Sequence, residues 1–138
     1  MKTDVLINGH FAICHAGHVR LFEFASRFGL VTVALNSDCW AHKKYGEEVI
    51  PLVDRAYVLR SNRFVHNVVA FNEETPAELI CQLRPRIIIK GPDYAGEALP
   101  EQWAIDKVGA KVIYYNGPKD EQSSSSGLLT QSKKLPLF

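Results

Sequence analysis

Residues 9–18 hold side chains that could perform more than one kind of chemistry. The stretch reads GHFAICHAGH and contains three histidines, one cysteine and two glycines. Imidazole and thiolate groups bind transition metals. Imidazole N–H groups beside glycine-rich backbone can instead bind phosphate. A histidine-rich loop that binds nothing is the third possibility, and the neighbouring elements must decide among them.

A metal site would use His10, Cys14, His15 and His18 as ligands. Their spacing lacks the two separated ligand pairs that are typical of structural zinc modules. Cys14 is also expected to be a small buried filler. Metal binding by this set is therefore kept only as an alternative.

A phosphate site fits the neighbouring pattern better. The apolar run at 5–7 predicts a strand before the stretch, and helical spacing from Gly17 onward predicts a helix after it, with Gly29 as its stop. A helix N-terminus offers free N–H groups and a positive dipole end to an anion. We therefore expect His15 and His18 to donate to phosphate oxygens.

The rest of the chain alternates strands and helices. Further strands are predicted at 30–35, 67–71, 87–89 and 111–115, and helices at 54–65, 75–83 and 100–107, with Thr75 and Glu78 forming a capping box. The strands are continuous apolar runs, which predicts a five-stranded parallel sheet with helices on both faces, a Rossmann-like α/β fold. Ligands of such sheets bind beyond the carboxyl ends of the strands. The loops after the first, second and fourth strands are thus the candidate site.

Composition narrows the function classes. The 138 residues carry a net charge of +1, so no global attraction to nucleic acid or membranes is expected. The three cysteines share no short spacing, which favours a reducing cytoplasmic setting over a disulfide framework. The polar start and the lack of a long apolar run predict neither a signal peptide nor a membrane span. We expect one domain over 1–138, with a Ser-rich tail from about 120.

The spacing G-x-F-x-x-x-H-x-G-H resembles the hallmark of the nucleotidylyltransferase superfamily. "LNSD" at 35–38, "PLVDR" at 51–55, the stretch at 71–94 and "SSSSGLL" at 123–129 extend the likeness. It is nearest to the adenylyltransferase domain of ADP-heptose synthases, with glycerol-3-phosphate cytidylyltransferases as the neighbouring group. The resemblance implies transfer of a nucleotide monophosphate from ATP or CTP to a sugar or polyol phosphate, with Mg²⁺ on the triphosphate, and a possible homodimer.

The resemblance also implies roles for individual residues. His15 and His18 would act on the nucleotide phosphates, and Lys43 or Lys44 would neutralise the transferring group; solvated loop charges are the alternative for these lysines. Nucleotide or acceptor contacts would come from the following residues: Asn8, Gly9, Phe11, Gly17, Arg55, Lys90, Gly91, Asp93, Ser124, Ser125 and Ser126. A surface ion pair is the alternative for Arg55, strand-end polarity for Lys90, Gly91 and Asp93, and a frayed tail for the serines.

One residue departs from the hallmark in a way that bears on activity. Ala12 stands where the superfamily carries an aspartate. The loss of this carboxylate could disturb loop ordering or metal handling. A catalytically weak nucleotide-binding module of the same fold is therefore the second hypothesis.

Overall fold

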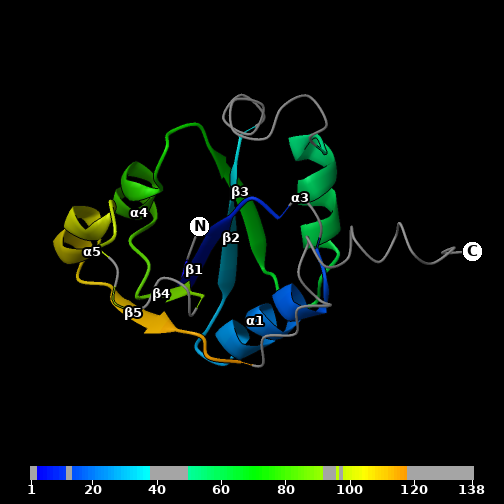
Figure 1. The fold of residues 1–138 in the computed structure, drawn as a ribbon, viewed down its shortest axis with the longest axis horizontal. Coiled ribbons are helices and arrows are strands. Elements are labelled where there is room, and N and C mark those ends of the chain that lie inside the picture. The colour runs from blue at the N-terminus through cyan, green and yellow to red at the C-terminus, as the bar shows by residue number, and fades with distance from the viewer. Residues whose placement is uncertain (1–2, 12–13, 38–49, 92–95, 97, 118–138) are drawn as a thin grey trace, which may run out of the picture.

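The structure is a computed structural model that describes residues 3–11, 14–37, 50–91, 96 and 98–117. Strands and helices alternate along it, as the apolar runs predicted (Figure 1). The elements are β1 (Val5–Gly9), α1 (Ala16–Ser26), β2 (Val31–Asn36), α3 (Leu52–Arg60), β3 (Asn67–Phe71), α4 (Ala77–Leu83), β4 (Ile87–Lys90), α5 (Gln102–Val108) and β5 (Lys111–Tyr114).

The five strands form one parallel sheet in the order β3-β2-β1-β4-β5. The chain moves outward from β1 to β3, then returns to the other side of β1 for β4. This reversal between β1 and β4 is the topological switch point, where parallel sheets open a crevice at their carboxyl edge. The predicted fold class is confirmed.

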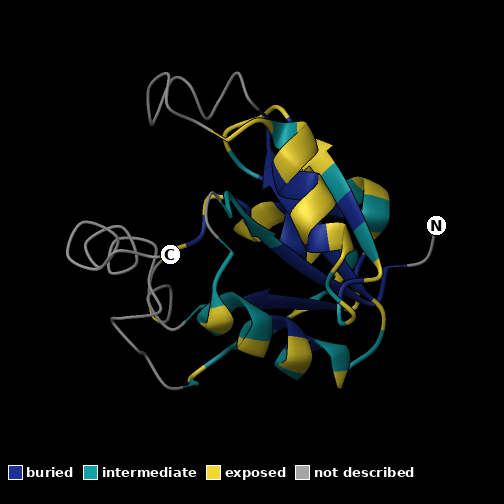
Figure 2. Ribbon diagram, turned by 90° about the vertical axis from the view of Figure 1, so that its right-hand side faces the viewer, coloured by how far each residue is buried: buried dark blue, intermediate teal, exposed yellow. Residues whose placement is uncertain are grey.

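Helices cover both faces of the sheet, so the central strands β2, β1 and β4 are largely buried on both sides, whereas the edge strands β3 and β5 are partly exposed (Figure 2). Helices α1 and α3 pack on one face, where Phe22, Ala25, Ala56 and Leu59 meet alternate residues of β1 and β2. On the opposite face, α4 and α5 pack on the intervening strand residues, such as Leu6 and Ile88. The period-two alternation of the strands thus sends consecutive side chains to different helices.

Helix ends differ from their predicted positions. Helix α3 covers Leu52–Arg60 rather than 54–65, because the chain turns into β3 after Ser61. Helix α4 begins after Pro76, which has no side-chain cap. The predicted capping box of Thr75 with Glu78 is therefore wrong, although the Thr75 hydroxyl accepts a hydrogen bond from the Ala77 N–H at 3.4 Å.

Candidate active site

Residues 9–18, called the histidine loop from here on, leave the sheet through a tight turn at the end of β1. Phe11 has a φ of 52°, in the left-handed region that non-glycine residues rarely adopt. Its ring folds back over Gly9, where an added Cβ would lie 2.8 Å from Phe11 Cε2. The same ring makes an edge contact with His18, with ring centroids 4.9 Å apart, and packs against Phe22 at 5.4 Å. Glycine at position 9 therefore lets Phe11 pack between the strand and the His18 ring.

His15 and His18 together cap the N-terminus of α1. His15 is the N-cap residue, and its Nδ1 accepts a hydrogen bond from the Gly17 N–H at 3.1 Å. In return, His18 Nδ1 accepts one from the His15 N–H at 3.3 Å. This reciprocal pattern is a capping box built from two imidazoles in place of the usual hydroxyl and carboxylate. It satisfies two of the backbone donors that a helix start leaves unpaired.

Capping also fixes the protonation of the two rings. Because each Nδ1 accepts a hydrogen bond, each neutral ring must carry its hydrogen on Nε2. The rings stack with centroids 3.8 Å apart, so charging both would place two cations in contact. Burial also lowers the pKa of His15 below its usual 6.5. Stacking therefore disfavours the state in which both rings are charged, and a neutral ring at either position is an Nε2–H donor at a helix start whose first turn carries no acidic residue.

Arg55 lies beneath this loop rather than in it. The residue is only 2% exposed. Its Nε donates to the Ile50 carbonyl at 2.8 Å, and one terminal nitrogen donates to the His10 and Asn36 carbonyls at 3.1 and 3.0 Å. This burial contradicts the surface position that was considered for Arg55. The guanidinium instead ties the histidine loop, the end of β2 and the start of α3 together.

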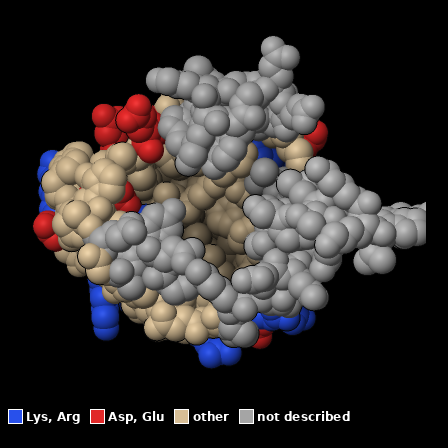
Figure 3. Space-filling view, viewed as in Figure 1, with Lys and Arg blue, Asp and Glu red and all other residues tan. Residues whose placement is uncertain are grey.

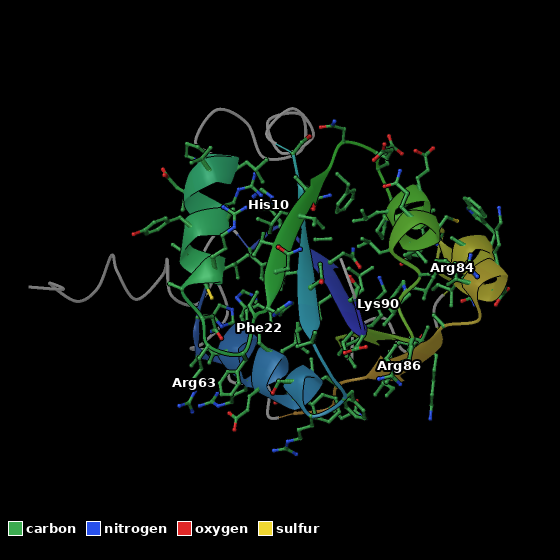
Figure 4. The ribbon with its side chains drawn as sticks, turned by 180° about the vertical axis from the view of Figure 1, so that it is seen from behind. His10, Phe22, Arg63, Arg84, Arg86 and Lys90 are labelled. Carbon is green, nitrogen blue, oxygen red and sulfur yellow. The ribbon has the colours of Figure 1, made fainter. Side chains whose placement is uncertain are left out.

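Lys90 is also buried, at the end of β4. Its ammonium donates to Glu101 Oε1 at 2.6 Å and to Asn8 Oδ1 at 2.8 Å. Neither the apolar run nor the resemblance pointed to Glu101, which lies eleven residues further along and just before α5. Gly91 follows Lys90, and a Cβ added there would meet nothing within 4 Å. Figure 4 shows His10 beside α3 and Lys90 at β4, on either side of the central strands.

Several predicted site residues are not described by the structure. Those outside the described residues are Lys43, Lys44, Asp93, Ser124, Ser125 and Ser126, together with Ala12.

The zinc alternative gains no support from the described residues. Among them, no group of three or more His, Cys, Asp or Glu side chains could hold a metal ion. Cys14 is partly buried against the core, which raises the pKa of its thiol and leaves it a weak ligand.

The face of the molecule viewed in Figure 3 is hollowed near its centre, where Figure 1 draws β1 and β2. The described atoms around the hollow belong mostly to uncharged residues.

Across the described part of the chain, no helix is both long enough and apolar enough to span a bilayer.

Comparison with known proteins decides the family. The cytidylyltransferase-like family profile matches residues 6–126, which include the histidine loop and the segments that follow β2, β3 and β4. The chain belongs to the cytidylyltransferase-like family. It is accordingly a nucleotidyltransferase, as the loop motif indicated.

The curated relatives that match this chain are longer proteins. It is 39% identical over 133 residues to the bifunctional protein HldE of Streptomyces coelicolor, covering 94% of this chain and 28% of that protein. It is 46% identical over 99 residues to HldE of Campylobacter curvus, covering 70% of this chain and 21% of that protein. The chain thus spans about a quarter of the length of these relatives.

Solved structures share the fold. A lipopolysaccharide core biosynthesis protein from Thermoplasma volcanium has a TM-score of 0.70 at 18% identity, with 86% of this chain and all of that chain covered. A pantothenate synthetase from Thermus thermophilus has a TM-score of 0.60 at 17% identity, with 96% of this chain and 65% of that chain covered. At these identities the likeness concerns the fold alone.

Proposed function

We propose that this protein transfers a nucleoside monophosphate from a Mg²⁺-bound nucleoside triphosphate to the phosphate of a sugar or polyol, and releases pyrophosphate. The observation that carries the proposal is the pair His15 and His18, whose Nδ1 atoms are occupied by backbone N–H groups at the start of α1. This arrangement supports two Nε2–H donors and a helix N-terminus acting on the same anion. ATP is favoured as the donor, with CTP as the alternative.

The chemistry is an in-line displacement at phosphorus. An oxygen of the acceptor phosphate forms a bond to the α-phosphorus, while the bond from that phosphorus to the bridging oxygen breaks and pyrophosphate leaves with the electron pair. Negative charge grows on the α-phosphoryl oxygens and on the leaving group. Fixed N–H donors aimed at these oxygens lower the barrier without a protein nucleophile. Mg²⁺ bound to the triphosphate would offset part of its charge.

Neutral rings suit this role. A neutral Nε2–H can donate to a phosphoryl oxygen in the ground state and strengthen that bond as charge develops. The cap holds each ring in place before the nucleotide binds, so less ordering is needed during the reaction. Lys43, Lys44 and the serines at 124–126 are proposed to supply further positive charge and hydroxyl donors to the triphosphate, and Asp93 to bind a ribose or sugar hydroxyl.

The acceptor is proposed to be a heptose-type phosphate. This choice rests on the likeness of residues 71–94 to ADP-heptose synthase adenylyltransferase domains and on the identity to HldE proteins. Glycerol phosphate is the alternative acceptor. The contacts that would select between them belong to scattered side chains, so the proposal is made at the level of substrate class.

A panel assay tests the function. Purified protein is mixed with MgATP or MgCTP and with a heptose, hexose or glycerol phosphate, and pyrophosphate release is followed by a coupled enzyme assay. We expect release that depends on both substrates and is fastest with ATP and the heptose phosphate. Nucleotide binding without release for any acceptor would instead favour the catalytically weak module that Ala12 suggests.

A further inference from the structure

The sheet splits at its switch point. Strand β1 keeps its register with β2 as far as Gly9 and Leu35, and β4 keeps its register with β5 as far as Lys90 and Tyr114. The pairing of β1 with β4 is shorter and covers only Val5 with Ile87 and Leu6 with Ile88. The last residues of these two central strands therefore have no backbone ladder between them, at the edge where ligands of such sheets bind.

A side chain bridges this split. Continuing the register of β1 and β4 by two residues would place Asn8 beside Lys90. These two residues meet through their side chains, with Lys90 Nζ 2.8 Å from Asn8 Oδ1. The bridge lies one residue before Gly9, where the histidine loop begins.

The same ammonium fixes a second loop. Lys90 ends β4 and Glu101 directly precedes α5, so their 2.6 Å ion pair joins the two ends of the segment 91–100. Both side chains are buried, with 6% and 5% exposure. A buried pair of this kind holds its geometry strongly, because breaking it leaves an uncompensated charge.

We infer that Lys90, Glu101 and Asn8 form a positioning triad that sets the width of the crevice between β1 and β4. This inference rests on the proposed function: the triad positions the histidine loop relative to the loop after β4. Lys90 then acts through Asn8 and not by contact with the nucleotide. Its charge already faces a carboxylate, and its side chain belongs to the α5 face of the sheet, whereas the histidine loop runs into α1 on the other face (Figure 4).

Two variants separate positioning from stability. Glu101→Leu leaves Lys90 buried without its carboxylate and should lower the unfolding midpoint. Lys90→Met combined with Glu101→Leu replaces the pair by apolar groups of similar size, a change that often restores stability. We expect the double variant to unfold near the wild-type midpoint and yet to lose kcat for pyrophosphate release by about tenfold or more, because the crevice is no longer bridged.

A third substitution tests the path through Asn8. Asn8→Ala alone should lower kcat to a similar extent, and adding it to the double variant should lower kcat no further, since coupled residues are not additive. The nucleotide KM should stay within about threefold of wild type throughout. Arg86→Met is the matched control. Arg86 pairs with Asp4 at 3.8 Å at the opposite end of the same two strands, and its 62% exposed side chain predicts unchanged kcat.

Turnover and the position of the two histidine rings are measured in separate experiments. Long-range ¹H–¹⁵N spectra of the imidazoles report the His15 and His18 rings without any substrate. Shifted ring signals in the double variant and in Asn8→Ala, but not in Arg86→Met, would support the triad. This readout holds even if the wild type releases no pyrophosphate. Such a lack of release would count against the proposed function alone. Unmoved ring signals would overturn the inference. So would a stable double variant with wild-type kcat, or one whose nucleotide KM rises more than about tenfold at unchanged kcat.

Discussion

At the scale of single residues, the histidine pair does two jobs with two different atoms. Nδ1 of each ring holds the start of α1, and a neutral ring held in this way carries its hydrogen on Nε2. Helix caps are usually serine, threonine, aspartate or asparagine. Imidazole replaces them here, which fixes the tautomer of a group that is expected to meet phosphate. Structure and proposed chemistry can therefore be separated by substitution.

Replacing His15 separates the two jobs. Asparagine is a strong N-cap residue, so His15→Asn should keep the free energy of unfolding within about 0.5 kcal/mol of wild type. His15→Ala removes the cap and should cost about 1 kcal/mol. Urea denaturation measures both. Equal stability of the alanine and asparagine variants would contradict a capping role for this ring.

Acid should loosen the same helix start. The pKa of His15 is lowered by burial, so the unfolded chain binds a proton more readily than the folded chain. The contribution of this ring to stability is thus complete above about pH 6.5, the ordinary histidine pKa, and is lost as the pH falls below it. NMR titration of the His15 ring should give a pKa below 6.5. A value above it would contradict the effect of burial on the His15 ring.

Some contacts of single residues could be predicted from the sequence, and others could not. The motif spacing predicted His15 and His18 as a pair, because three residues apart at a helix start brings two side chains together. It could not predict that Glu101 meets Lys90, since that contact depends on how the chain returns to the sheet after eleven residues. Nor could it predict that Arg55 is buried, because its partners are backbone carbonyls, which no residue type identifies.

At the scale of elements, α3 serves as an anchor for two loops. Arg55 projects from its buried side and donates to carbonyls of the histidine loop, of β2 and of the segment before α3. The guanidinium has enough donors in a fixed plane to join all three. Helix α3 covers the sheet with its apolar side, and through Arg55 it also fixes the histidine loop and the segment before α3 at the carboxyl edge.

Removing this anchor should be costly. Arg55→Met leaves three carbonyls near the site without their donor and should lower the free energy of unfolding by about 3 kcal/mol. Arg60→Met is the control, because Arg60 is exposed on the same helix and should cost no more than about 0.5 kcal/mol. Chemical denaturation compares the two. Equal losses would show that the three hydrogen bonds add nothing specific.

Strands were predicted more closely than helix ends. The continuous apolar run at 87–89 matches β4 closely, because a strand buried on both faces demands apolar side chains throughout. Helix ends are decided by local caps and by where the chain must turn. Pro76 rather than Thr75 starts α4, and α3 stops at Arg60 so that the chain can return to β3.

At the scale of the whole molecule, the site follows from the strand order. Placing β1 between β2 and β4 opens the switch point beside the histidine loop, at the edge where the carboxyl ends of these parallel strands lie. The alternation of strands and helices was sufficient to predict the parallel sheet and to point to its carboxyl edge, but the strand order comes from the structure. Substrate choice was beyond such reasoning, because it depends on individual side chains of the loops rather than on the order of elements.

The central claim is that the histidine pair acts on the nucleotide while it caps α1, and His18→Gln tests it most directly. Glutamine is a standard partner at this position of a capping box, so the variant should keep the fold. Its amide N–H sits on a flexible side chain, whereas the imidazole N–H belongs to a ring held against Phe11. Pyrophosphate release with MgATP and the best acceptor should therefore fall by about 100-fold or more while the unfolding midpoint stays near wild type. Release at the wild-type rate by a folded His18→Gln protein would contradict the claim.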